Sequence, residues 1–412
     1  MKFLHLADLH LGKMLCGASL IENGDQVFYL QQLIGLIDRE KPDAVVIAGD
    51  VYDRGVPSKE AVTLLGSFLA ALAGAERRIP VLMIAGNHDG GERLNFAKEL
   101  LSERNVHISG TAERTLTSVA LDADGEPVTF WLMPYVFPMK VRDLFSLTAE
   151  DVPDYESAVR VLLEHQDIDT TRRNVLIAHQ FVTAGQSSPI QGGSESAAGG
   201  LGAVDYSVFN AFDYVALGHI HSAQHIGRDS VRYAGAPLCY HFSEIGQKKG
   251  ALMVTLGEKG TPPRYELFEL PVLHNMRRIV GKFDGIIEQE RRSSARNEYI
   301  SAVLTDNDTV PDAAEQLRAL LESHGSRLLD ISFQPERDFA AGLESTAANA
   351  HEKSMAELFA DFFESRCGRA MDCAEREVID AVSHRISGGE EIGTDELADY
   401  IVKLVLEQEE RK

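Results

Sequence analysis

The chain has 412 residues, a formal net charge of −23 and a hydrophobic content of 44%. This length predicts two or three domains, and the composition is that of a globular protein. We expect no transmembrane helix, because no run of about 18 apolar residues occurs, and the short apolar N-terminus predicts a cytoplasmic protein without a signal peptide. The negative charge argues against tight nucleic-acid binding by this chain alone, although a local patch or a partner could supply cations.

Strand-like and helix-like segments alternate through the first part of the chain. We expect strands at residues 2–7, 43–48 and 80–85, and helices at residues 25–40 and 58–73, from their apolar spacing. This alternation predicts an α/β fold, in which ligands gather at the carboxyl ends of the strands.

Further elements are predicted toward the middle of the chain. They are antiparallel strands within residues 115–136, a helix at 155–165, and strands at 174–178, 214–217, 231–234 and 251–256. Residues 183–202 are rich in Gly, Ser and Ala, which predicts a mobile loop.

The pattern changes near residue 270. Strands are expected at residues 277–283, 299–304 and 328–333, with a helix at 311–323, which together predict a small separate α/β unit. Beyond it, residues 338–350 have the composition of a linker, and residues 351–412 have a helical and acidic character. We therefore expect three parts, residues 1–270, 271–340 and 341–412.

Clusters of polar residues follow the predicted strands. They are Asp8-x-His10, Gly49-Asp50-x-x-Asp53, Gly86-Asn87-His88-Asp89, and His179 together with Gly218-His219-x-His221. Residues i and i+2 leaving a strand point the same way, so each x-spaced pair can present two ligands to one cavity. A single His or Asp after a strand is more often a turn residue, but the recurrence of such residues at five strand ends favours a metal site. His5, by contrast, has no such context, and we expect no ligand role for it.

The ligand types indicate which ions the site binds. Mixed oxygen and imidazole ligands without thiolate suit Mn²⁺, Fe or Zn²⁺ better than Ca²⁺. Seven ligands are too many for one tetrahedral ion, but they suit two ions that share a bridging carboxylate. Two ions roughly 3.5–4 Å apart can activate a water for in-line attack on phosphorus. The residues thus predict a two-metal phosphoesterase.

In their order along the chain, these motifs resemble the calcineurin-like metallophosphoesterase superfamily. That resemblance implies a four-layer αββα sandwich of two central mixed sheets flanked by helices. A finer resemblance, specific across residues 1–270, is to the bacterial SbcD family of nuclease subunits. The segments that carry it are residues 4–12, 48–54, 85–89, 178–182, 214–221 and 233–238, followed by Phe242-Ser243-Glu244 and Lys248-Lys249-Gly250.

The resemblance implies a role for each motif residue. One ion would be bound by Asp8, His10, Asp50 and His221, and the other by Asp50, Asn87, His179 and His219, with Asp50 as the bridge. His88 would contact the phosphate or protonate the leaving 3′ oxygen; the alternative is that it only supports a ligand. Archaeal and eukaryotic relatives carry His at the position of Asp53, so Asp53 is expected to orient His88 or a bound water.

The family also implies a function and partners. It implies a Mn²⁺-dependent DNA nuclease of DNA repair, a 3′→5′ exonuclease on duplex ends and an endonuclease on single strands or hairpins. The partner would be an SbcC-like SMC-type ATPase, in a heterotetramer built on a homodimer and without a membrane. The chain contains no GxxxxGK[ST] loop, so ATP hydrolysis would belong to that partner.

The resemblance implies that contacts with DNA, with the ATPase and with a second copy of the chain lie outside the metal site. Residues 271–340 would form a capping domain that helps to position DNA, and the C-terminal helices would dock on the ATPase. Two apolar stripes could serve that docking or pack on each other; they are Leu358, Phe359, Phe362 and Phe363, and Ile401, Val402, Leu404 and Val405. The family dimerises through helices at 58–73 and 92–104. Candidate contact residues there, which could equally be core, are Phe68, Leu69, Leu72, Leu94 and Leu101.

Two other functions fit parts of the pattern. Residues 49–55 also resemble the GDxxDRG motif of protein phosphatases, so a protein phosphatase or a small phosphodiester hydrolase is the main alternative. A non-catalytic adaptor for the ATPase is the third possibility, and the complete ligand set speaks against it.

Overall fold

The computed structural model describes residues 1–334 except 75–76, 124–125, 194, 196–201, 295 and 309, together with residues 360, 363, 371, 376 and 379. The chain divides into two compact units, Met1–Leu304 with Pro311–Ser332, and Thr305–Val310 with Phe333–Lys412. The elements below belong to the first unit, except that Phe333, the last residue of β19 (Arg327–Phe333), falls in the second. The predicted linker at 338–350 lies outside the described residues, as do both apolar stripes apart from Phe363.

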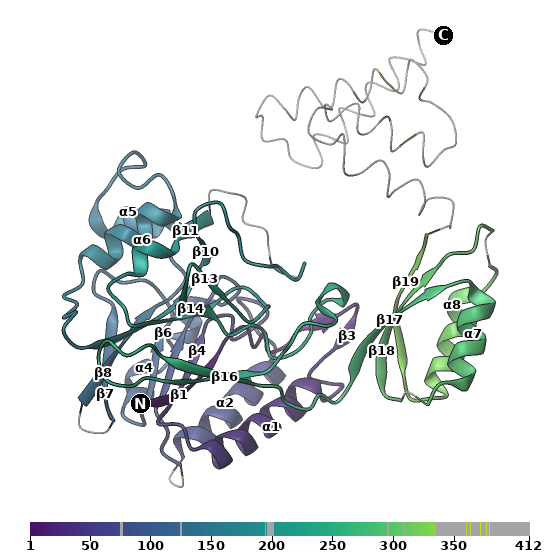
Figure 1. Ribbon diagram of the computed structural model, residues 1–412, viewed down its shortest axis with the longest axis horizontal. Coiled ribbons are helices and arrows are strands. Elements are labelled where there is room, and N and C mark those ends of the chain that lie inside the picture. Colours follow the sequence, from purple (N-terminus) through teal and green to yellow (C-terminus); the bar gives the residue numbers. More distant parts are fainter. Residues whose placement is uncertain are drawn as a thin grey trace. The chain divides into compact units, whose positions relative to one another are not determined.

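Two six-stranded sheets form the centre of this unit (Figure 1). The first has the order β16-β15-β1-β4-β5-β6, with bounds Arg264–Phe268, Ala251–Thr255, Lys2–Leu6, Ala44–Ala48, Val81–Ile84 and Val106–Ser109. The second has the order β13-β14-β12-β9-β8-β7, with bounds Gln224–Ile226, Arg228–Tyr233, Tyr214–Gly218, Arg173–His179, Glu126–Met133 and Thr117–Ala123. Both sheets are mixed, because β1, β4, β5 and β6 pair in parallel while β15 pairs antiparallel to β1, and the second sheet likewise combines parallel and antiparallel pairs.

The two sheets pack face to face, and helices cover their outer faces. Phe3 of the first sheet meets Phe130 of the second with ring centroids 5.3 Å apart, inside a largely apolar layer. Helices α1 (Asp25–Glu40) and α2 (Lys59–Ala73) bury their apolar sides on the first sheet. Helices α5 (Pro138–Phe145) and α6 (Tyr155–Glu164) do so on the second. The expected αββα sandwich is confirmed (Figure 1).

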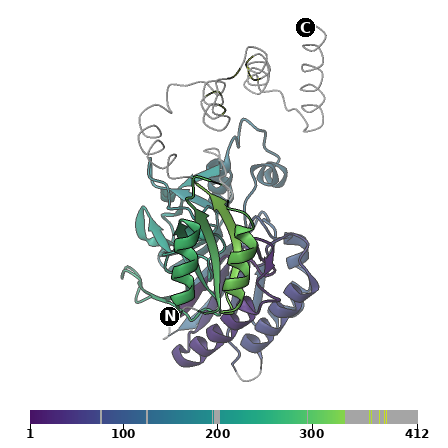
Figure 2. The same cartoon turned by 90° about the vertical axis from the view of Figure 1, so that its right-hand side faces the viewer.

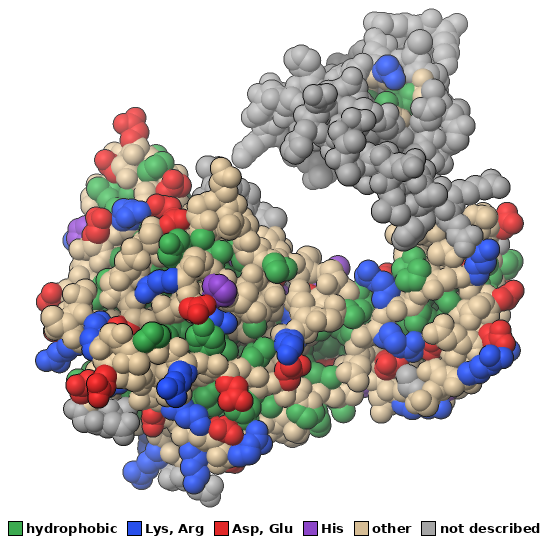
Figure 3. All heavy atoms as spheres, viewed as in Figure 1, with side chains coloured by type: hydrophobic (Ala, Val, Ile, Leu, Met, Phe, Trp, Pro, Cys, Tyr) green, Lys and Arg blue, Asp and Glu red, His purple; other side chains and the backbone are tan. Residues whose placement is uncertain are grey.

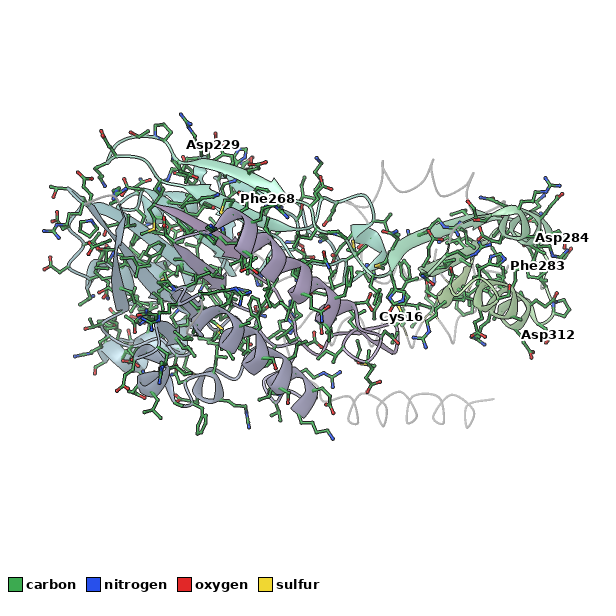
Figure 4. All side chains as sticks on the ribbon, turned by 90° about the horizontal axis from the view of Figure 1, so that it is seen from below. Cys16, Asp229, Phe268, Phe283, Asp284 and Asp312 are labelled. Atoms are coloured by element: carbon green, nitrogen blue, oxygen red, sulfur yellow. The ribbon has the colours of Figure 1, made fainter. Side chains whose placement is uncertain are left out.

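A third, three-stranded sheet follows in the sequence. Its strands β17 (Asn275–Gly281), β18 (Glu298–Leu304) and β19 (Arg327–Phe333) lie in chain order, and α7 (Phe283–Arg292) and α8 (Ala313–Glu322) pack on one face (Figure 2). Figure 4 labels Phe283 and Asp284 at the start of α7 and Asp312 just before α8. A small α/β unit is therefore present where the sequence predicts one. Its bounds at 271 and 340 stay a prediction.

Shorter elements complete the described part. They are β2 (Met14–Leu15), β3 (Ala18–Ser19), α3 (Gly91–Leu94), α4 (Lys98–Ser102), β10 (Phe181–Thr183), β11 (Ala203–Asp205) and the 3-10 helices Tyr206–Phe209 and Phe242–Glu244. Among the described residues, no helix is both long and apolar enough to cross a membrane.

Two sequence-based expectations for individual elements are wrong, and one helix was not anticipated. The helix expected at 92–104 is divided into α3 and α4, because Ala97 adopts a left-handed conformation with φ 59° between them. The strand expected at 277–283 ends at Gly281, and Phe283 instead begins α7. Helix α5 was not expected, since its eight residues are too few to show a helical period clearly.

Candidate metal centre

The predicted ligands lie where strands of the two central sheets end. Strands β1 and β4 run in parallel, and their loops stay paired beyond the strands: the Asp8 amide donates to Gly49 O at 3.1 Å, and the His10 amide donates to Asp50 O at 2.9 Å. In the second sheet, β9 and β12 are parallel neighbours that deliver His179 and the 219–221 loop to the same edge. Because all these carboxyl ends meet at one edge, residues far apart in sequence become neighbours.

Four of these residues have an unusual backbone conformation. Asp8, His10, Asp50 and His219 have φ values of 53°, 41°, 47° and 98°, in a region that residues other than glycine seldom occupy. Such conformations persist where the surrounding structure enforces them, and they gather at functional sites. The backbone therefore turns sharply at four predicted ligand positions.

One group of side chains contains Asp8, His10 and His221. All three are buried, and their potential ligand atoms lie within 4.8 Å of one another. The Nε2 atoms of the two imidazoles face each other at 3.2 Å. The Asp8 carboxylate also accepts the amide of His219 at 3.0 Å, which anchors it to the opposite sheet.

A second group lies beside the first. Oδ2 of Asp50 is 3.3 Å from Nε2 of His179 and 3.5 Å from Nε2 of His10, so one carboxylate oxygen faces a histidine of each group. The amide oxygen of Asn87 is 3.1 Å from both Nε2 of His179 and Nδ1 of His219. The structure thus brings all seven predicted ligands together.

The donor set fits divalent cations. Two imidazole nitrogens 3.2 Å apart repel each other unless a proton or a metal ion lies between their lone pairs. The same cluster holds two buried carboxylates and an amide oxygen, which are ligands for Mn²⁺, Fe or Zn²⁺. Among the described residues, the three clusters of candidate metal ligands all belong to this region.

Protonation within the cluster follows from burial and from opposite charges. Burial raises the pKa of Asp8. For Asp50, burial acts in the same sense, but the neighbouring histidines, with His179 first among them, together outweigh burial and hold the Asp50 pKa below its usual range. Although burial opposes it, Asp50 in turn raises the pKa of His179 to about 9. Burial, followed by His179, lowers the pKa of His219 to about 3. In the absence of a metal ion, these shifts favour a negative charge on Asp50 and a positive charge on His179, whereas a metal-bound histidine would be neutral.

His88 lies at the rim of the cluster rather than inside it. Its amide donates to Asp50 Oδ1 at 2.9 Å, and its Nδ1 is 3.1 Å from the backbone oxygen of Asp53. The carboxylate of Asp53 faces elsewhere, toward Nζ of Lys13 at 2.9 Å and Nδ1 of His10 at 3.5 Å. Asp53 thus contacts His88 through its main chain and His10 through its side chain.

Several residues of the site have no role in the sequence-based interpretation. Tyr240 donates to the backbone oxygen of Leu9 at 2.7 Å, and its ring lies against His10 and His221. Asp89 accepts the amides of Tyr52 and Gly86, at 2.8 and 2.9 Å. Glu244 lies 3.3 Å from Nδ1 of His221. In the sequence, only the family resemblance singles out segments 242–244 and 248–250, the first of which contains Glu244.

His5 takes the structural role expected for it. The side chain is fully buried, with Nδ1 at 3.1 Å from the Tyr214 hydroxyl and Nε2 at 3.2 Å from Leu217 O. Both ring nitrogens are therefore satisfied within the interior.

The fold and the cluster at its strand ends define a metal-dependent phosphoesterase. Residues 1–223 match the model of the calcineurin-like phosphoesterases, and residues 272–366 match a model described as the type 5 capsule protein repressor C-terminal domain. The chain is 33% identical to the D subunit of nuclease SbcCD from Staphylococcus epidermidis over 322 residues, which is 78% of this chain and 83% of that protein. The chain belongs to the calcineurin-like phosphoesterase family and, within it, to the SbcD family.

One solved structure is a more distant match. NAD nucleotidase of Haemophilus influenzae aligns over 89% of this chain and 71% of that chain, at 13% identity and a TM-score of 0.36. A likeness this weak carries no argument about the present protein.

Proposed function

We propose that this protein is the DNA nuclease subunit of an SbcCD-type DNA-repair complex. It hydrolyses phosphodiester bonds, as a 3′→5′ exonuclease on duplex ends and as an endonuclease on single strands or hairpins. The observation that carries the proposal is the convergence of seven oxygen and imidazole ligands in a chain of the SbcD family. Its DNA substrate and its SbcC-like ATPase partner follow from the named relative.

Two divalent ions, which we propose to be Mn²⁺, would stabilise charge on the phosphate oxygens and lower the pKa of the attacking water. The geometry supports Asp50 as the bridge, because its Oδ2 faces histidines of both groups. We assign one ion to Asp8, His10, Asp50 and His221, and the other to Asp50, Asn87, His179 and His219.

The chain's own contribution to the reaction centres on His88. Nδ1 of His88 donates its proton to Asp53 O, which leaves Nε2 directed away from that anchor and available to substrate. The half-buried position of the ring allows a phosphate to reach it, unlike the four buried histidine ligands around it. We propose that His88 contacts the phosphate or protonates the leaving 3′ oxygen.

The decisive experiment compares two substrates. Purified full-length protein with Mn²⁺ is assayed on labelled duplex DNA and on a phosphopeptide, with and without the SbcC-like ATPase. Cleavage of DNA supports the nuclease. Turnover of the phosphopeptide while DNA stays intact would establish the phosphatase alternative instead.

The charge of the chain bears on how DNA is held. A net charge of −23 predicts weak DNA affinity for the isolated chain, so we propose that the ATPase partner supplies much of the basic surface. DNA cleavage should therefore rise when the partner is added. A cytoplasmic location is part of the same proposal, because DNA repair of this kind acts on chromosomal DNA there.

We propose that the homodimer forms at an apolar cleft beside α2, α3 and α4. The cleft has a volume of about 1000 Å³. Phe96 is 82% exposed and Leu100 is 68% exposed beside it, an unusual exposure for large apolar side chains. Of the contact residues suggested by the sequence, Phe68 and Leu72 are buried in this chain's own core, whereas Leu69 and Leu101 line the cleft. Leu94 is buried and also lines the cleft.

A further inference from the structure

A buried carboxylate stands directly behind one predicted metal ligand. The Glu244 side chain is completely buried, and its Oε1 lies 3.3 Å from Nδ1 of His221. Its other oxygen, Oε2, accepts the amide of Tyr240 at 3.1 Å and pairs with Nζ of Lys249 at 2.7 Å. Because an unpaired buried charge is strongly unfavourable, these contacts explain how a carboxylate can stay ionised here.

Lys249 also contacts His221 directly. Its Nζ donates to the backbone oxygen of His221 at 2.7 Å, in addition to the ion pair with Glu244. The Lys249 side chain is only 7% exposed, so contacts within the protein, rather than solvent, hold it in this position. Glu244 and Lys249 together therefore hold both the ring and the main chain of His221.

This contact selects one tautomer of His221. A carboxylate at Nδ1 favours the proton on that nitrogen and puts the lone pair on Nε2. Nε2 is the atom that faces Nε2 of His10 at 3.2 Å, inside the predicted ion site. The orientation needed for metal binding thus exists in the chain's own hydrogen bonds.

The neighbouring ion site is built differently. Nδ1 of His179 donates to a neutral backbone oxygen, that of Ala48, at 2.8 Å. His219 directs Nδ1 toward Asn87. A charged carboxylate backed by a lysine is therefore a feature of the His221 side, and a change at Glu244 should act on one ion site.

We propose that Glu244, held by Lys249, is a positioning residue that fixes the tautomer and the orientation of His221. It thereby sets the affinity of the ion site formed by Asp8, His10 and His221, and leaves the site of His179 and His219 nearly unchanged. This inference rests on the two-ion centre of the proposed function.

The test measures metal binding without DNA. Metal-stripped full-length protein is titrated with Mn²⁺ by calorimetry, and free Mn²⁺ is followed by electron paramagnetic resonance. The parent should bind two ions. Glu244→Gln keeps the shape but removes the charge, and it should weaken one of the two sites by roughly 10–100-fold while the other keeps its affinity. Lys249→Met should weaken the same site.

An exposed pair close by offers a matched control. Lys248 and Glu269 form an ion pair of 3.3 Å in which both side chains are more than half exposed. Glu269→Gln makes the same chemical change next to the same type of cation, but away from the ligands. Both ion affinities should stay at the parent values in this control.

A double substitution separates positioning from general damage. If Glu244 acts through His221, Glu244→Gln should have no further effect on that site once His221→Asn is present. Equal weakening of both sites, or full additivity of the two substitutions, overturns the proposal. If Glu244→Gln does not fold, Glu244→Asp is titrated and judged by the same one-site criterion. A parent that binds two ions but cuts no DNA would contradict the nuclease function and leave this inference standing.

Discussion

His5 and His179 are both fully buried imidazoles, yet their neighbours drive their pKa values in opposite directions. His5 has neutral partners, Tyr214 and Leu217, so burial lowers its pKa to about 3. His179 lies against the carboxylate of Asp50, which overcomes burial and raises its pKa to about 9. The same residue type is thus a structural group in one place and, beside a carboxylate, a candidate metal ligand in the other.

His5 should make the protein less stable in mild acid. Unfolded His5 takes up a proton below pH ~6.5, whereas the buried ring stays neutral down to about pH 3. The unfolded state binds more protons in that window, so this residue's contribution to stability falls by roughly 1.4 kcal/mol per pH unit below 6.5. Urea unfolding from pH 8 to 5 measures the slope. The His5→Gln variant should show a shallower slope, and identical slopes would refute this role.

His88 and Asp50 should separate catalysis from metal binding. His88→Gln should keep both ions and lose DNA cleavage by roughly 10²–10⁴-fold, the range for a positioned acid or base. Asp50→Ala should lose metal as well, because Asp50 faces both groups of ligands. Elemental analysis after dialysis, together with cleavage rates, measures the two properties. Full activity in either variant would be inconsistent with the assigned roles.

At the scale of elements, the two sheets approach each other closely beside the site. Gly218 at the end of β12 lies so near Ala48 of β4 that an added Cβ would be 1.9 Å from the Ala48 backbone oxygen. At Gly49, with φ 85°, an added Cβ would be 2.3 Å from Nδ1 of His179. Glycine at these strand ends is therefore required for backbones of opposite sheets to meet, which in turn brings the proposed ligands together.

Gly218→Ala should destabilise the protein and disturb metal binding together. Because the methyl group would overlap backbone rather than a flexible side chain, we expect a loss of about 3 kcal/mol, at the upper end of the range for overpacking. Gly35 in α1 is the control, since an added Cβ there meets nothing within 4 Å. Gly35→Ala should instead stabilise by about 1 kcal/mol through helix propensity. Equal effects at the two positions in thermal unfolding would contradict this reasoning.

At the scale of the whole described molecule, one buried carboxylate of the sandwich bonds to two residues in or beside the third sheet. Asp25, at the start of α1, accepts the Tyr299 hydroxyl at 2.6 Å and pairs with Nδ1 of His274 at 2.8 Å. The next residue, Gln26, donates to His10 O at 2.8 Å. Adjacent residues of one helix therefore contact the third sheet and the loop of a proposed metal ligand.

Tyr299→Phe should loosen this junction. The substitution removes the hydroxyl that donates to the buried carboxylate of Asp25. We expect the free energy of unfolding to fall by roughly 1.5–3 kcal/mol as a result. Amide hydrogen exchange should become faster in β18 and in the first turn of α1. Exchange in β9, inside the sandwich, serves as the internal control and should not change. Unaltered protection of β18 would show that the junction does not depend on this contact.

Acidic and basic side chains are interspersed over the described surface in the view of Figure 3. We therefore expect two copies of the chain to associate through apolar surface. Phe96→Glu, beside the proposed dimer cleft, should convert the dimer to a monomer. Light scattering coupled to size-exclusion chromatography measures the mass. Val280→Glu is a matched control, because Val280 is 57% exposed on β17, away from the cleft. A dimer that survives Phe96→Glu would exclude this cleft as the interface.

Local pattern was sufficient for much of this protein. The apolar periods at 25–40 and 58–73 predicted α1 and α2 closely, and buried runs predicted the strands that carry the ligands. Spacing also predicted which residues leave those strands toward one edge, because neighbouring parallel strands end on the same side. These are short-range properties, so a single sequence contains them.

Only the tertiary structure decided which ring nitrogen faces which partner. His10 and His221 are separated by 211 positions, and their Nε2 atoms meet because the two sheets pack face to face. Glu244 stands behind His221, and the carboxylate of Asp53 turns to Lys13, through contacts that no period or spacing encodes. Side-chain direction depends on packing between distant segments, and that packing exists only in the folded chain.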